Sequence, residues 1–231
     1  MLSLSNIGIK TQLEKNRISF IIVSAVSVTA LIYSALRYNV FGGISWEQLP
    51  LYILNKAISF SGISLLTLGL ILNRKSESGT KLIVKLYDSK NDFTGIGFLY
   101  IFIHILLSLI LLNPLNYKKL YDSGGLFNPA GGISLAAGAL TFAAFAGMFF
   151  SNGSDSSYYS GIRVFLFSKP VKAAVSFLLL AHLFFLGYQG WLTPDNWPGG
   201  MPPITLISFL IYLAGAFICL KKKRNELGKR Q

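Results

Sequence analysis

Six long apolar stretches, separated by short polar segments, dominate the pattern of this chain. Each is close to the roughly 20 residues that an α-helix needs to cross about 30 Å of hydrocarbon. Turn residues such as Asn113-Pro114 mark the breaks between them. The pattern therefore predicts an all-α integral membrane bundle of six transmembrane helices. The predicted spans are residues 18–38, 51–72, 93–112, 133–150, 171–192 and 204–220.

The composition supports a membrane protein. Only 13% of the residues are charged and 52% are hydrophobic, whereas soluble domains carry about 25% charged residues. A chain of 231 residues suits a single bundle. We therefore expect a cytoplasmic N-terminal segment at 1–17, a six-span transmembrane domain at 18–220 and a basic cytoplasmic tail at 221–231.

The basic residues are distributed unevenly between the two sides of the predicted bundle. Of 21 Lys and Arg residues, only Arg37, Lys56, Lys118 and Lys119 fall on one side. The positive-inside rule then places both termini in the cytoplasm. The net charge of +12 is explained by these loops and ends, so the lipid bilayer is the expected partner and nucleic acid is not.

The chain contains only two histidines, and both lie inside predicted spans. Ionisable groups in hydrocarbon are rare and usually functional. His104 and His182 lie on parallel spans, each roughly 16–18 Å from the cytoplasmic boundary at 1.5 Å rise per residue. Two neutral imidazoles at equal depth are what a bis-histidine haem requires. The pattern favours one b-type haem, with His104 and His182 as its iron ligands, and makes 18–220 a haem-binding transmembrane domain.

A small and polar stripe surrounds the first of these histidines. Gly97, Tyr100, His104 and Ser108 follow helical spacing in an otherwise aliphatic span. A glycine near an axial ligand leaves room for a flat macrocycle, so Gly97 and Tyr100 are candidate cofactor-binding residues. Such stripes also serve ordinary helix packing in membranes.

Lys56 lies near the outer end of the second predicted span. The simplest interpretation is that its ammonium group reaches the lipid headgroups. The functional alternative pairs it with a haem propionate or an anionic quinone headgroup, and Arg37 and Lys118 have similar roles available. The fourth span is rich in alanine and glycine, including Gly138, and is expected to be a close-packing helix only.

Several short segments resemble the ferric reductase-like transmembrane domain family. They are GFLYIFIH ending at His104, AHLFFLGY containing His182, GYQGWLTPDNWPGGMPP at 187–203, and Asn55-Lys56-Ala57. The family includes the haem-binding membrane subunit of bacterial methionine sulfoxide reductase systems, the STEAP metalloreductases and the NADPH oxidases. The resemblance implies a multi-pass protein of the bacterial inner membrane that relays electrons towards an outer acceptor, such as an exported redox partner.

The sequence departs from the larger relatives in two respects. They place two histidines 13 or 14 residues apart on one helix, but no histidine lies at those offsets from His104 or His182, so one haem is expected. No Gly-rich phosphate loop occurs either. Electrons are therefore expected from a separate flavin reductase or from membrane quinol, and a quinone is the second candidate cofactor.

Two other functional classes remain open at this point. The first is a small transporter or channel-like protein that uses His104 and His182 as proton-relay groups. The second is a structural or assembly subunit without a cofactor. The sequence contains no GxSxG or HExxH motif, so hydrolytic chemistry is not indicated. If the chain is an oxidoreductase, we predict no catalytic side chain in it.

Overall fold

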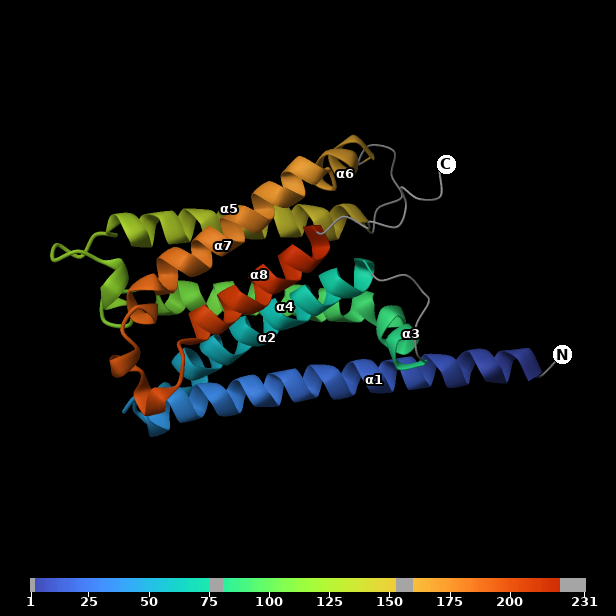
Figure 1. Ribbon diagram of the computed structural model, residues 1–231, viewed down its shortest axis with the longest axis horizontal. Helices are drawn as coiled ribbons and strands as arrows, with labels where there is room; N and C mark the ends of the chain where they lie inside the picture. Colours follow the sequence, from blue (N-terminus) through green and yellow to red (C-terminus); the bar gives the residue numbers. More distant parts are fainter. Residues whose placement is uncertain (1–2, 75–80, 153–159, 221–231) are drawn as a thin grey trace.

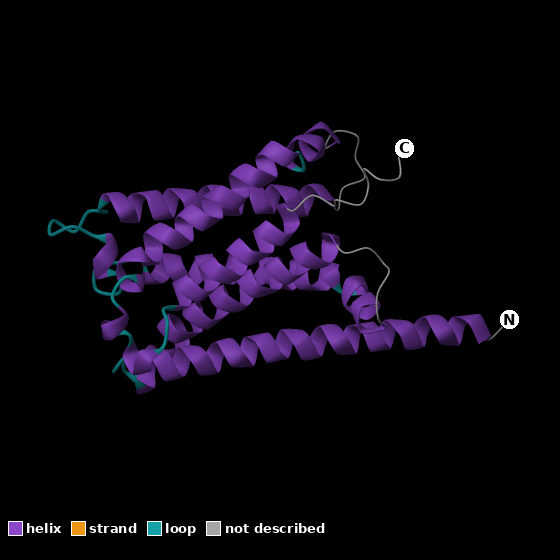
Figure 2. Cartoon of the chain, in the orientation of Figure 1, coloured by secondary structure: helices purple, strands orange, loops and turns teal. Residues whose placement is uncertain are grey.

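The computed structural model describes residues 3–74, 81–152 and 160–220. In these ranges the chain forms helices joined by short loops and contains no strand (Figures 1 and 2). Six segments are long and apolar enough to cross a membrane, which confirms the predicted all-α, six-span architecture. They are Arg17–Val40, Trp46–Asn73, Lys90–Leu111, Pro129–Ser151, Lys169–Trp191 and Pro198–Cys219.

The spans are built on six long helices with short helical turns between them. The long helices are α1 (Ser3–Ser34), α2 (Leu54–Arg74), α4 (Lys90–Leu111), α5 (Pro129–Asn152), α7 (Lys169–Trp191) and α8 (Ile204–Leu220). Two short helices, α3 (Lys81–Asp88) and α6 (Ser160–Leu166), precede α4 and α7. The π-helical turns η1 (Ala35–Val40) and η3 (Leu49–Ile53) follow α1 and precede α2, and the 3-10 turn η4 (Lys118–Leu120) lies between α4 and α5.

The first span does not begin as a separate element. α1 starts at Ser3 and continues through Arg17 into the apolar stretch. The segment 1–17 thus differs from the span in composition, but from Ser3 onwards it belongs to the same helix. No proline interrupts residues 3–34, so nothing in the backbone ends the helix there.

α1 begins and α8 ends at the same end of the bundle (Figure 1). α1, α4 and α7 run away from that end, and α2, α5 and α8 run back towards it. The opposite end carries the segments 112–128 and 192–203. We call it the outer end, because the distribution of Lys and Arg predicts that it faces outward; the other is the inner end.

α2 is the helix around which one half of the bundle packs. It contacts α1, α4 and α8, and its longest contact is with α4. Glycines let these two backbones approach closely. A Cβ atom added at Gly97 of α4 would lie 2.9 Å from the Leu66 backbone nitrogen and 3.1 Å from the Gly62 carbonyl oxygen of α2. Gly97 therefore belongs to the interface between α2 and α4.

α5 and α7 form the second closely packed pair, and α7 also contacts α8. Between the two pairs, α4 and α5 meet through phenylalanine rings. The Phe98 ring of α4 stacks on Phe142 and Phe149 of α5, with centroids 5.8 Å and 4.7 Å apart. The bundle thus contains two tight helix pairs, each with one histidine, which are joined by these rings and by α8, since α8 contacts both α2 and α7.

The orientation of the bundle is testable with single cysteines in a Cys219→Ser background. Ser123 is exposed at the outer end and Gly161 is exposed on α6 at the inner end. We expect Ser123→Cys to react with a membrane-impermeant maleimide in intact spheroplasts, and Gly161→Cys to react only after lysis. The reverse labelling would place the termini outside and contradict the positive-inside assignment.

The glycine contact between α2 and α4 predicts a difference between two neighbouring substitutions. Gly97→Ala should lower the free energy of unfolding by about 1–3 kcal/mol, because its methyl group overpacks the interface. Gly95→Ala is the matched control, since a Cβ there meets nothing within 4 Å. It should leave stability unchanged or raise it by up to about 1 kcal/mol. Thermal unfolding in detergent measures both, and equal midpoints would refute the close contact.

Candidate functional site

His104 is held by α2. Its Nδ1 atom lies 2.7 Å from Oδ1 of Asn55, a residue with no exposed surface. Ser108, one turn further along α4, lies 3.4 Å from the same Nδ1. The amide oxygen is the shorter contact and can only accept, so the imidazole donates its Nδ1–H to Asn55. This bond fixes the orientation of the ring.

The rest of the Asn55 amide is also satisfied. Its Nδ2 atom donates to Oγ of Ser108 at 3.1 Å and approaches the Tyr117 hydroxyl at 3.5 Å. Tyr117 belongs to the outer segment between α4 and α5 and is itself buried. A buried side-chain network of this kind is rigid when every member has a partner. Asn55 therefore connects His104 to the outer end of the bundle.

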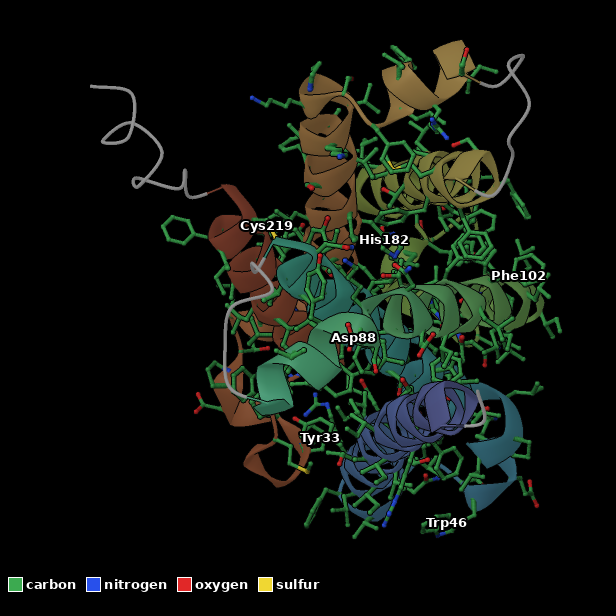
Figure 3. The ribbon with its side chains drawn as sticks, turned by 90° about the vertical axis from the view of Figure 1, so that its right-hand side faces the viewer. Tyr33, Trp46, Asp88, Phe102, His182 and Cys219 are labelled. Atoms are coloured by element: carbon green, nitrogen blue, oxygen red, sulfur yellow. The ribbon has the colours of Figure 1, made fainter. Side chains whose placement is uncertain are left out.

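His182 is held in the same way by α5. Its Nδ1 atom lies 2.8 Å from the backbone carbonyl oxygen of Ser134, and the Ser134 hydroxyl donates to the His182 carbonyl at 3.0 Å. Gly138 makes this approach possible. A Cβ atom there would lie only 2.7 Å from His182 Nδ1. The ring lies towards the middle of the bundle rather than on its rim (Figure 3).

The two histidines therefore share one arrangement. Each donates Nδ1–H to an oxygen of the neighbouring helix in its own pair, which leaves the Nε2 lone pair free. In the described part of the chain neither Nε2 has a hydrogen-bond partner. Both residues keep some accessible surface.

The depths of the two rings agree with each other. His104 lies seven residues before the outer end of α4 at Leu111, and His182 lies nine before the end of α7 at Trp191. At 1.5 Å per residue these separations are about 10 Å and 14 Å. Both imidazoles thus lie well inside the apolar segments, in the outer half of the bundle.

The other residues of the predicted stripe face different neighbours. Gly97 packs against α2, and the Tyr100 hydroxyl lies 3.0 Å from Oγ of Ser27 on α1. These contacts give both residues a role in helix packing, and their predicted contact with a cofactor stays a prediction. Ser108 joins the Asn55 network. The whole stripe follows the side of α4 that packs on α1 and α2.

Lys56 packs against two tyrosine rings. Its Nζ atom lies over the rings of Tyr52 and Tyr117, 5.0 Å and 4.7 Å from their centroids. Cation–π contacts of this kind hold an ammonium group over aromatic faces. Lys56 follows Asn55 in the sequence, and both contact Tyr117. It therefore lies beside the His104 network.

Sequence reasoning missed the contribution of the fourth span. We expected Gly138 to serve close packing only, but the structure places it directly against His182, with Ser134 as the hydrogen-bond partner. The available signal was the small and polar series Ser134, Gly138 and Thr141 at helical spacing. Asn55 had a stronger signal, because a buried amide in a span needs a partner.

Comparison with protein-family models and with curated proteins finds no match for this chain. The assignment of a function therefore depends on the residues of the site.

His104 is bonded to a side-chain oxygen and His182 to a backbone oxygen. We therefore expect substitution of the two anchoring residues to lower stability unequally. Asn55→Ala removes the side-chain oxygen closest to His104 Nδ1, leaving only the 3.4 Å contact with Ser108, and should lower the free energy of unfolding by about 1–3 kcal/mol. Ser134→Ala keeps the backbone carbonyl that binds His182 and should cost about 1 kcal/mol or less. Thermal unfolding of the two variants in detergent tests this. A larger loss for Ser134→Ala would contradict the hydrogen-bond assignment.

Proposed function

We propose that the protein is a membrane b-type cytochrome that holds one haem between the Nε2 atoms of His104 and His182. The observation that carries the proposal is the pairing of both Nδ1 atoms with oxygen acceptors, which leaves both Nε2 atoms free. Histidines that bind metals almost always donate their other ring N–H to an oxygen, and this bond fixes the tautomer and raises ligand basicity.

Structural histidines would be expected to use their polar atoms differently. A histidine that only stabilises packing in hydrocarbon gains most when both ring nitrogens are satisfied. In both His104 and His182, Nδ1 has a hydrogen-bond partner and Nε2 has none among the described residues. The two residues also come from different helix pairs at comparable depth, which supports ligation of one iron from two sides.

Several features of the surroundings fit a flat, largely apolar cofactor. Phenylalanines separate α4 from α5 where the two helix pairs meet. Thr141, one turn from Gly138 on α5, is buried, and its hydroxyl has no hydrogen-bond partner among the described residues. The residues present would thus offer two imidazole nitrogens, an apolar lining and a hydroxyl without a partner among the described residues.

In this proposal the chain relays electrons, in agreement with its resemblance to the ferric reductase-like family. Haem supplies a one-electron change at its iron. The residues of the chain hold the two imidazoles at fixed orientation and exclude water from the apolar interior. The donor is a cytoplasmic flavin reductase or a membrane quinol of the bacterial inner membrane. The acceptor lies on the outer side and is an exported redox partner.

The proposal predicts a haem spectrum that depends on both histidines. The detergent-purified protein from haem-replete cells should contain about one haem per chain, with sharp b-type bands in the dithionite-reduced minus oxidised spectrum. His104→Ala and His182→Ala should each abolish those bands, because each removes one axial ligand. Absorbance and pyridine haemochrome quantification provide the measurement.

Gln189→Ala is the control on the same helix as His182, since Gln189 is exposed. It should retain the full haem content. Circular dichroism and gel filtration establish that the histidine variants remain folded. Haem-free wild-type protein, or folded histidine variants with unchanged haem content, would refute the proposal and leave proton relay or a structural role as the hypotheses to test.

A further inference from the structure

Three basic residues from three segments gather at the outer end of the bundle. Arg37 lies in η1 after the first helix, Lys56 lies in the first turn of α2, and Lys119 lies in η4. Lys119 is within electrostatic reach of both Lys56 and Arg37. We call these three residues the outer cation cluster.

Arg37 is the most buried member of the cluster, with 6% of its surface exposed. One guanidinium nitrogen, Nη1, donates to the carbonyl oxygen of Met201, and the Cζ atom lies 5.4 Å from the Tyr38 ring centroid. Its Nε atom is buried and has no hydrogen-bond partner among the residues that the structure describes. An unpaired N–H on a buried charged group is costly unless a ligand accepts from it.

A series of tyrosine rings connects Arg37 to Lys56. The Tyr38 and Tyr52 rings meet edge to face with centroids 5.9 Å apart, and Tyr52 and Tyr117 lie 6.1 Å apart. The ammonium group of Lys56 lies over the last two rings. Arg37, Tyr38 and Tyr52 all belong to π-helical turns, a local geometry that is frequent at functional sites.

Within residues 3–74, 81–152 and 160–220, the cluster has no balancing negative charge. None of its three members has a carboxylate partner in the described part of the chain. Desolvation, followed by the like charges of Lys56 and Arg37, lowers the pKa of the Lys119 ammonium group to about 8. Repulsion among the three cations destabilises their charged forms. A bound anion would offset this repulsion.

The cluster lies directly outside the two histidines. Tyr117 and Leu120 form a hydrophobic cluster with Leu111, against which Tyr52 and Leu186 also pack. Leu186 is one helical turn beyond His182 and Leu111 is two turns beyond His104. These positions are about 6 Å and 10 Å further out along the helix axes. A group bound between the two Nε2 atoms would thus have its outer edge near Tyr117 and Lys56.

We propose that the outer cation cluster is a carboxylate-binding site that takes the two propionates of the haem, so that the propionate edge faces the outer end. This inference rests on the proposed function. Two adjacent carboxylates match several cations on one side of the site, and charge-assisted hydrogen bonds to them are stronger than neutral ones. A neutral quinone would leave the positive charge of the cluster uncompensated.

The experiment compares haem b with its dimethyl ester, in which both carboxylates are blocked. Protein from haem-deficient cells is titrated with each compound in detergent, and dissociation constants are read from the Soret band. Wild-type protein should bind haem at least about tenfold more tightly than the ester, as expected for charge-assisted pairing. Lys56→Met and Lys119→Gln should weaken haem binding and leave ester binding unchanged.

Lys118→Gln is the matched control, because Lys118 is the neighbour of Lys119 in the sequence, is also exposed and is outside the cluster. It should keep the wild-type preference for haem. A variant that misfolds would lose both ligands equally, so the ratio of the two constants reports carboxylate binding specifically.

Each other outcome contradicts a different hypothesis. Equal affinity of wild-type protein for haem and its ester would overturn the carboxylate site and leave haem binding by His104 and His182 intact. Preference for haem that survives both cluster variants would place the propionates elsewhere. If the protein binds neither compound, both the proposed function and the propionate assignment are refuted.

Discussion

The hydrogen bond between His104 and Asn55 joins the two most closely packed helices, α2 and α4. No water is available in the hydrocarbon to satisfy either group, so each polar side chain there needs a partner within the protein. Gly97 allows the two backbones to approach closely two turns away. Loss of the Asn55 amide would free His104, Ser108 and Tyr117 together. The position of the ring thus depends on the packing of the helix pair.

α5 and α7 also provide a partner for a histidine in the hydrocarbon, but the acceptor is a backbone group. His182 binds a backbone carbonyl, and Gly138 provides the space that its ring needs. A backbone acceptor survives any substitution of Ser134, whereas Asn55 is a removable acceptor. Between the pairs, α4 and α5 meet through phenylalanine rings rather than through close backbone contact, and α8 packs against both α2 and α7. This division keeps each histidine rigid within its pair and leaves its second nitrogen on the side away from its anchor.

The outer end combines positive charge with aromatic rings. Arg37 and Lys56 lie over or beside tyrosines, and both lack a carboxylate among the described residues. Tyr117 belongs to both systems, since it contacts the Asn55 amide and the Lys56 ammonium group. The histidine network and the cation cluster are therefore continuous. The outer segment that carries Tyr117 thus contacts both the anchor of His104 and the Lys56 ammonium group.

The sequence by itself determined the six spans, because length and hydropathy are local properties of each stretch. Their alternation across the membrane placed His104 and His182 on parallel helices at similar depth. The sequence also identified Lys56 as a charged residue inside an apolar span. Only the tertiary structure decided which neighbour each side chain meets. Gly97 and Tyr100 share a helical face with His104 but pack on α2 and α1, and Ser134 and Gly138 came from a span that had no ionisable group. Helical periodicity fixes the face on which a residue lies, whereas the partner across that face depends on how non-adjacent helices pack.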